Sequence, residues 1–430
     1  MIKLMLVLTS LAVAYSVNAL PPAPAETQQS PVAIIGATLH IGDGTVMEQG
    51  TVTFSNGLIT GVYPKDEAPG LDDHMVFDRS GEHVYPGFIL PNSNVGLKEV
   101  NSVRASVDDK ERGLLNASVR VLPAYNTDSE VIPTFRFNGV LTAQVAPTGS
   151  LIAGNSSIMQ LDAWNWEDAA IAIDDAMHIY WPALVKRKVD AIKQQVSYSM
   201  NENYEARIEL LRALFAEAEH TESSDNLNIK AVKAVLEGKS QLFLHGESAK
   251  QLVDAIQFVR RFNIQRAVLV GARDALQVKE LILESGLPVI VHFVHGLPLH
   301  PERSVDESYE RAARFIEAGF RVGLSSKIRM EPASGRNLPF MAGTAAAYGI
   351  DKEQAVHLIT LSNAEILGID DQLGSISVGK QATLFTSKGD ALDMRSNNLT
   401  SAYIQGRKVT IEGMQQDLFE RFKTKYSEKK

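Results

Sequence analysis

The feature that most constrains the fold of this 430-residue chain is an apolar stretch, residues 84–90, that runs into the polar elbow Asn92-Ser93-Asn94. Before it, apolar and polar residues alternate between turn residues, which is typical of a small β-sheet. The pair Asn56-Gly57 within that region predicts a two-residue hairpin, because both residues tolerate a positive φ. After the elbow, strand-like and helix-like segments follow one another.

Between residues 86 and 368, eight apolar strand candidates alternate with helical patterns. This order predicts a parallel sheet that crossover helices close into a barrel. The strand candidates lie near residue 88 and at residues 140–145, 157–161, 177–181, 242–245, 267–270, 288–293 and 321–325. Helices are expected at residues 184–220, with an interruption near 200–203, and at 248–262, 276–285, 306–318 and 352–367.

Three short segments occur in order at suitable spacing: Pro86-Gly87 with Ile89, His245-Gly246, and Gly374-Ser375-Ile376 followed by Gly379-Lys380. On these segments the chain resembles the metal-dependent amidohydrolase superfamily, in its imidazolonepropionase-like branch. The resemblance implies an α/β fold, with a (β/α)8 TIM barrel over residues 86–370. It also implies that this barrel is inserted into a composite β-sandwich, formed by residues 31–85 plus 371–412, with strands expected near 374–380, 382–386 and 402–409.

The superfamily holds a divalent, zinc-like metal at the carboxyl ends of the barrel strands. Its ligands are two histidines after strand 1, a lysine or glutamate after strand 4, a histidine after each of strands 5 and 6, and an aspartate after strand 8. Such a metal lowers the pKa of a bound water, which then attacks an amide-like carbon. The matching positions here carry Asn92, Asn94, His245, Val270 and Lys327, and strand 4 ends without a lysine or carboxylate.

These substitutions predict that most of the metal ligands are missing, so no metal site is assigned. Amide oxygens of Asn92 and Asn94 are poor ligands for zinc-like ions, and we expect both residues to contact substrate instead. The ammonium group of Lys327 opposes a nearby cation. His245 and Lys327 are the candidate catalytic residues. The alternatives are a hydrogen-bonded structural role for His245 and a surface-loop position for Lys327.

A different metal site is conceivable at the seventh strand. His292 lies in that strand and His295 follows it, with His300 close behind, and His245, His292 and His295 together would supply three imidazoles. Three imidazoles with an open fourth position form a known type of zinc site. Residues three apart on a strand face opposite sides, however, which argues against this arrangement.

Other polar residues surround the expected mouth of the barrel. The excursion between Arg104 and Glu130 is denser in polar residues than barrel closure needs, so it is a substrate loop, a lid, a subunit contact or a solvated loop. Further polar side chains expected at the mouth are those of Thr148, Ser150, Asn155, Glu247, Arg273, Asp274, Arg329, Arg336 and Asn337.

The N-terminal residues and the net charge indicate the cellular location of the protein and the partners that it can bind. Residues 1–19 resemble a signal peptide, with Lys3, an apolar run over residues 4–17 and a Val17-Asn18-Ala19 cleavage pattern; a retained anchor is the alternative. The formal charge is −9, from 42 basic and 51 acidic residues without a basic stripe, which argues against nucleic acid or an anionic membrane as partner. The chain has no cysteine. An exported, periplasmic protein without a membrane span after signal cleavage is expected.

The resemblance therefore implies an exported hydrolase of carbon–nitrogen bonds other than peptide bonds, acting on a cyclic amide-like small molecule with an altered metal site. The alternative is a catalytically inactive homologue, which binds a small ligand or serves as partner to an active paralogue. A homo-oligomer is compatible with either hypothesis.

Overall fold

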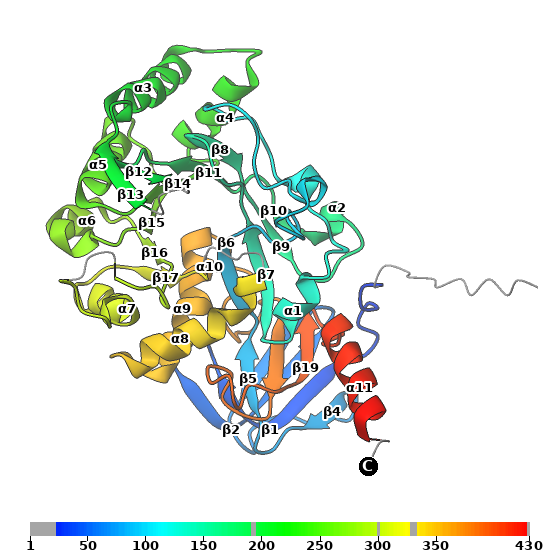
Figure 1. The fold of residues 1–430 in the computed structure, drawn as a ribbon. Coiled ribbons are helices and arrows are strands. Elements are labelled where there is room, and N and C mark those ends of the chain that lie inside the picture. The colour runs from blue at the N-terminus through cyan, green and yellow to red at the C-terminus, as the bar shows by residue number, and fades with distance from the viewer. Residues whose placement is uncertain (1–22, 191–194, 299–301, 327–332, 428–430) are drawn as a thin grey trace, which may run out of the picture.

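The computed structural model describes residues 23–190, 195–298, 302–326 and 333–427. An eight-stranded sheet lies at the bottom of Figure 1, and two further sheets with their helices lie above it. The expected signal peptide and Lys327 both fall outside the described residues. No helix in the described part of the chain is both long and apolar enough to cross a membrane.

The eight-stranded sheet combines strands from both ends of the chain. Its order is β20 (Arg407–Val409), β19 (Leu399–Ile404), β18 (Leu384–Ser387), β5 (His83–Pro86), β1 (Val32–His40), β2 (Val46–Ser55) and β3 (Leu58–Tyr63), and β4 (Met75–Asp78) pairs with β1. Strands β18 and β5, about 300 residues apart, pair antiparallel, with Phe385 opposite Tyr85. The hairpin between β2 and β3 is confirmed, with φ of 52° at Asn56 and 80° at Gly57.

The strand expected near residues 374–380 does not form. Gly374 and Gly379 have φ values of 90° and 89°, which are incompatible with an extended strand. The segment still binds the sheet, because the N–H of Ile376 donates to the carbonyl of Ile41 at 2.8 Å and that of Gly379 to the carbonyl of Ile59 at 2.9 Å.

All eight expected barrel positions are strands, arranged in two sheets. The first has the order β10 (Ala170–Ala172), β9 (Ser157–Gln160), β7 (Val140–Val145) and β6 (Phe88–Ser93). The second has the order β17 (Val322–Leu324), β16 (Val289–Val291), β15 (Ala267–Gly271), β14 (Gln241–Gly246), β11 (Ala176–Tyr180) and β8 (Ile152–Asn155). Barrel strands one to eight are therefore β6, β7, β8 with β9, β11, β14, β15, β16 and β17.

The expectation of an all-parallel barrel is wrong at the third barrel strand, which runs antiparallel to its neighbours. Strands β8 and β9 form one strand interrupted at Ser156, and it runs antiparallel to β7 on one side and to β11 on the other. Only residues 146–151 connect it to β7. A parallel return needs a crossover of about a dozen residues or more, so the chain turns straight back instead.

Strands β6 and β17 are joined by side chains. In the described ranges no main-chain ladder connects these two strands. Asn363, fully buried on α10 (Leu361–Leu367), donates through Nδ2 to the carbonyls of Ile89 at 2.8 Å and Leu324 at 2.9 Å. Ser325 Oγ donates to the carbonyl of Pro91 at 2.8 Å. These hydrogen bonds link the first and last strands through side chains.

Most helices lie along the outer side of the barrel sheets, and others lie at the boundary with the eight-stranded sheet or beside that sheet (Figure 1). Besides α10 they are α1 (Ile132–Arg136), α2 (Trp166–Ala169), α3 (Tyr204–His220), α4 (Leu227–Leu236), α5 (Ala249–Arg261), α6 (Lys279–Ser285), α7 (Glu307–Glu317), α8 (Leu338–Ala347), α9 (Lys352–Ile359) and α11 (Met414–Ser427). The helices expected near 248–262, 276–285, 306–318 and 352–367 are confirmed as α5, α6, α7, and α9 with α10.

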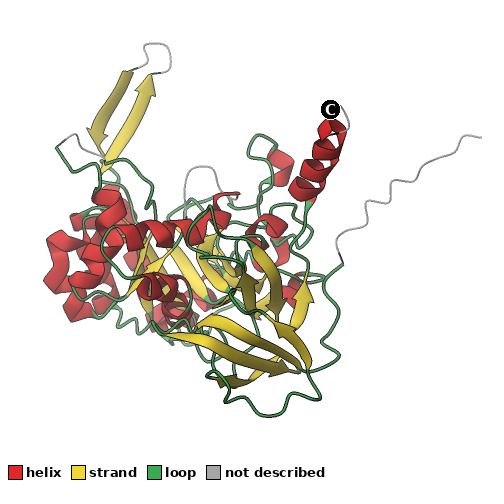
Figure 2. Cartoon of the chain, turned by 90° about the horizontal axis from the view of Figure 1, so that it is seen from below, coloured by secondary structure: helices red, strands yellow, loops and turns green. Residues whose placement is uncertain are grey.

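The helix expected over residues 184–220 begins only at Tyr204. The preceding residues form a hairpin of β12 (Val185–Asp190) and β13 (Gln195–Met200), which projects from the body at the upper left of Figure 2. Val196, Tyr198 and Met200 alternate with polar residues along β13, and this period of two was the strand signal. All three side chains are exposed, so the hairpin adds little to the core.

Candidate active site at the mouth of the barrel

Polar side chains lie above the apolar interior at the ends of the central strands. Because alternate residues of a strand face the same side, His178, His245 and His292 each lie two positions beyond an apolar residue of the barrel interior. The three histidines are 0%, 7% and 6% exposed. Three imidazoles from strands four, five and seven are thus buried near the carboxyl ends of the barrel strands, where enzymes of this architecture place their chemistry.

His245, a candidate catalytic residue, is bound to a second imidazole. Its Nε2 lies 2.9 Å from Nδ1 of His178 on the neighbouring strand β11. The ring of Tyr180 stacks on the His245 ring, with centroids 4.0 Å apart and planes 15° apart. The sequence interpretation did not include His178, although its place two residues before Tyr180 on one face of a strand was a usable signal.

Asn92 and Asn94 are both buried at the end of β6, at 2% and 3% exposure. Asn92 has a φ of 55°, and its backbone N–H donates to Gln144 Oε1 at 3.0 Å. Asn94 donates through Nδ2 to Asp109 Oδ2 at 3.3 Å. The substrate-binding role expected for the two asparagines stays a prediction.

Asp109 links the polar excursion to the first strand. This residue is 3% exposed, and its Oδ2 also accepts from Lys98 Nζ at 3.1 Å and from Thr148 Oγ1 at 3.0 Å. The excursion therefore packs part of its polar content against the mouth of the barrel. Whether it acts as a lid or substrate loop stays a prediction.

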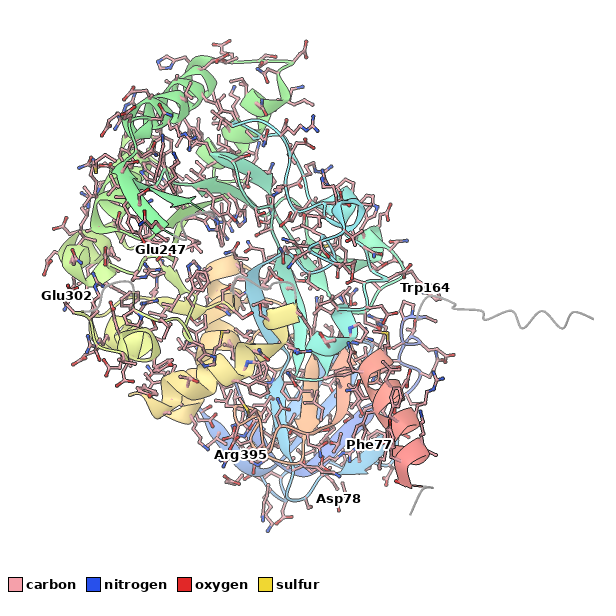
Figure 3. All side chains as sticks on the ribbon, viewed as in Figure 1. Phe77, Asp78, Trp164, Glu247, Glu302 and Arg395 are labelled. Atoms are coloured by element: carbon pink, nitrogen blue, oxygen red, sulfur yellow. The ribbon has the colours of Figure 1, made fainter. Side chains whose placement is uncertain are left out.

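A carboxylate and an imidazole pair at the ends of strands five and seven. Glu247, labelled in Figure 3, lies directly after β14, and His292 lies directly after β16. Glu247 Oε1 is 2.7 Å from His292 Nε2. Burial alone would raise the pKa of Glu247, but the hydrogen bond and charge of His292, followed by the charges of Arg273 and Arg311, hold it below its usual value. Glu247 is therefore an ionised partner for the imidazole.

The three-imidazole alternative does not assemble. His245 is bonded to His178 and His292 to Glu247, while His295 Nε2 lies 2.8 Å from Thr344 Oγ1 at the surface. His300 falls outside the described residues. Within the part of the chain that the structure describes, no group of three or more histidine, aspartate or glutamate side chains is arranged to hold a metal ion.

At the positions that the sequence resemblance matches to the superfamily's ligands, the donor chemistry also fits a divalent cation poorly. Asn94 faces Asp109, a carboxylate that the ammonium of Lys98 already contacts. Val270 is fully buried in the apolar interior. Lys327, at the remaining position, is not among the described residues. We therefore derive no chemical step through a metal.

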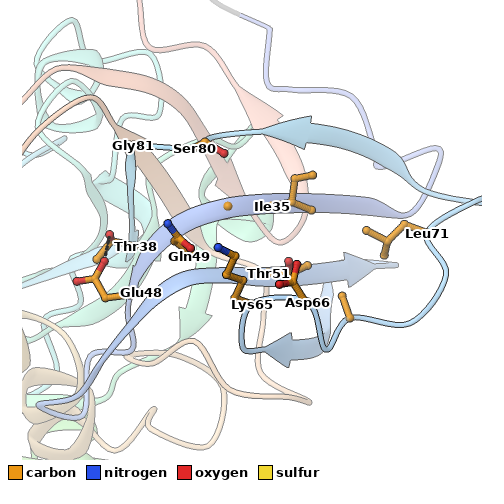
Figure 4. Close-up of a pocket in the computed structure, with 12 residues that line it drawn as sticks. Ile35, Thr38, Glu48, Gln49, Thr51, Lys65, Asp66, Leu71, Ser80 and Gly81 are labelled. Atoms are coloured by element: carbon orange, nitrogen blue, oxygen red, sulfur yellow. Dashed lines mark hydrogen bonds between the residues drawn. The ribbon is translucent and has the colours of Figure 1, made fainter.

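A groove lies elsewhere, on the eight-stranded sheet. It has a volume of about 550 Å³ and is drawn in Figure 4. Thr38 Oγ1 donates to Glu48 Oε2 at 2.8 Å on its wall, with Lys65 and Asp66 at another edge. None of its described lining side chains has a buried polar atom without a partner, so it offers less to a ligand than the mouth does.

Two curated relatives share parts of this sequence. An imidazolonepropionase from Parabacteroides distasonis is 34% identical over 86 residues, which are 20% of this chain and 21% of the relative. An imidazolonepropionase from Fusobacterium nucleatum is 27% identical over 168 residues, or 37% of this chain and 40% of the relative. The chain thus matches two-fifths or less of the length of these relatives.

Solved structures show the same fold over a longer range. An amidohydrolase from Thermotoga maritima superposes with a TM-score of 0.76 at 20% identity, over 88% of this chain and 99% of that one. An adenosine deaminase from Xanthomonas campestris with bound zinc superposes with a TM-score of 0.52 at 15% identity, over 94% and 98% of the two chains. These likenesses support a TIM barrel with an additional β domain. The sequence model of the amidohydrolase family matches residues 180–412, more than half of the chain, and the protein therefore belongs to the amidohydrolase family.

Proposed function

We propose that this protein hydrolyses a carbon–nitrogen bond in a small cyclic amide-like compound at the mouth of its barrel. The observation that carries the proposal is the set of buried polar side chains at the strand ends of an amidohydrolase-family chain, above all His245 against His178. The imidazolonepropionase relatives favour a cyclic amide over a linear one. Export to a periplasm is part of the same proposal, on the strength of residues 1–19.

In this proposal the chemistry runs without the usual set of metal ligands. His245 contacts the substrate and exchanges a proton with His178 through their shared hydrogen bond. Lys327 supplies the positive charge that polarises the amide carbonyl, in the position where the superfamily has its aspartate. Buried electrostatic stabilisation of this kind is worth several kcal/mol because the local dielectric constant is low.

The test is turnover of a panel of cyclic amides: imidazolonepropionate, hydantoin and dihydrouracil, with ring opening followed by mass spectrometry. The double variant His245→Ala and Lys327→Ala should lose most of the activity with little change in melting temperature. His220→Ala is the control, because that side chain is 77% exposed on α3. Undiminished turnover in the double variant would reject the site, and no turnover above the blank with any compound would favour the inactive homologue.

A further inference from the structure

The contact between Glu247 and His292 depends on an unusual strand end between them. Strand β15 separates their two strands and ends at Gly271, which has a φ of 91°. A Cβ atom at Gly271 would lie 2.6 Å from Glu247 Oε1 and 3.0 Å from His292 Cε1. Only glycine therefore leaves room for the carboxylate and the imidazole to meet across the sixth strand.

The pairing determines which nitrogen of His292 carries the proton. An ionised carboxylate only accepts hydrogen bonds, so Nε2 of His292 donates, and when the His292 ring is neutral its Nδ1 is an acceptor. Nδ1 is buried and has no hydrogen-bond partner among the described residues. A buried acceptor without a partner is unfavourable, so each such atom in a folded protein calls for an explanation.

Positive charge holds the pair in place from two other elements. Arg273 Nη2, in the turn after β15, lies 3.8 Å from Glu247 Oε2. Arg311 of α7 is 5% exposed and reaches the carbonyl oxygen of His292 at 3.4 Å. The carboxylate is thus kept ionised while the backbone of the histidine is fixed.

We propose that His292 is the general base of the hydrolytic reaction, with Glu247 as its positioning residue. This inference rests on the proposed function. Nδ1 takes a proton from a water molecule as the water oxygen bonds to the amide carbon. Nδ1 then gives that proton to the leaving nitrogen as the carbon–nitrogen bond breaks, which opens the substrate ring to a single molecule with a carboxylic acid and a new N–H group and restores the neutral imidazole. No metal, oxidant or further reactant enters this sequence.

The tautomer can be measured without any substrate. In nitrogen-15 NMR spectra of the full chain with labelled histidine, the His292 ring should show a protonated Nε2 and a bare Nδ1, and its signals are assigned by their loss in His292→Gln. Gly271→Ala should displace the carboxylate and change these signals, while His295→Gln should leave them unchanged. A protonated Nδ1 in the neutral wild-type ring would overturn the assignment.

Turnover of the same cyclic amides tests the catalytic role. His292→Gly and His292→Gln should each lower kcat about 100-fold or more, the usual contribution of a positioned base. Added imidazole should restore part of the activity of His292→Gly, which a purely structural role would not predict. Glu247→Gln should lower kcat more than it changes KM, Glu247→Asp should recover part of the loss, and His295→Gln should stay within about twofold of wild type.

Each outcome decides between the two proposals. If the wild type turns over a panel compound and both His292→Gly and His292→Gln stay within twofold of its kcat, His292 is not the general base. The proposed function would then remain intact. No wild-type turnover of any panel compound would overturn the proposed function and the catalytic role together, and the tautomer measurement would still establish whether the dyad itself exists.

Discussion

Single residues at the strand ends determine what the mouth of this barrel can bind. The resemblance to the superfamily implies that Asn94 and Val270 stand where imidazole ligands are expected, and Lys98 places an ammonium group beside the carboxylate that Asn94 contacts. We predict that the protein, purified without chelators, carries well under one equivalent of divalent metal. Elemental analysis after dialysis measures this directly. A stoichiometric content of zinc, manganese or iron would contradict the prediction.

Asp175 is another single residue with a testable effect, because its buried carboxyl group makes the free energy of unfolding depend on pH. Burial raises its pKa to about 6, although hydrogen bonds from Gln144 and Ser156 oppose the rise. The folded pKa is above the unfolded value near 3.8, so the stabilising contribution is complete below about pH 4 and is lost as pH rises through 6. The loss amounts to about 3 kcal/mol at the usual value per pKa unit.

The variant Asp175→Asn isolates this effect. Subtracting its unfolding free energy from that of wild type at each pH, by urea denaturation from pH 4 to 8, should give a difference that falls with rising pH and levels off above pH 7. A difference that stays flat or grows with pH would contradict the sign. Asp43→Asn, at an exposed turn, is the control for a general effect of removing one carboxylate.

The sequence could predict those site residues whose location follows from their place at the end of an apolar strand. His245, Asn92 and Asn94 lie at strand ends as expected, because each follows an apolar run. Their partners could not be predicted in the same way. His178 and His245 are 67 residues apart and meet only because β11 and β14 pair in one particular register. A register of this kind depends on tertiary packing rather than on local pattern.

At the scale of elements, the junction of β6 and β17 depends on Asn363. We predict that Asn363→Ala lowers the free energy of unfolding by about 2–4 kcal/mol, because two buried carbonyl groups lose their donor. Asn138→Ala should cost about 1 kcal/mol or less, since Asn138 gives a single bond to the carbonyl of Arg336 at a partly exposed position. Urea denaturation measures both, and equal losses would argue against the junction's importance.

The helices and strands were predicted well where the apolar periodicity of a segment and the length of the connection before it indicated the same structure. The amphipathic helices α5 and α7 follow their patterns closely. The β12–β13 hairpin was mistaken for helix because its charged residues also fit a helical face, although Val196, Tyr198 and Met200 alternate. The reversed third strand was missed for a different reason: its apolar pattern is the same in either direction, and only the short connection after Val145 reveals the turn.

The whole molecule depends on the pairing of its two ends. Strand β18 completes the sheet beside β5, and Leu384, Phe385 and Tyr403 are buried there. Burying one such side chain contributes roughly 1.5–3 kcal/mol, whereas a domain has only about 5–15 kcal/mol of net stability. Losing several of these side chains at once would therefore remove most of the margin.

We accordingly predict that a chain ending at Asp370 does not fold cooperatively, whereas a chain ending at Glu412 does. The shorter chain loses β18, β19 and β20, and so exposes the apolar side of β5. The longer one loses only the end of the chain with α11, in which no residue is buried, so its free energy of unfolding should change by about 0.5 kcal/mol or less. Thermal melting by circular dichroism and size-exclusion chromatography distinguish the two. A soluble, monomeric and cooperatively melting chain that ends at Asp370 would show that the N-terminal strands are stable without their C-terminal partners.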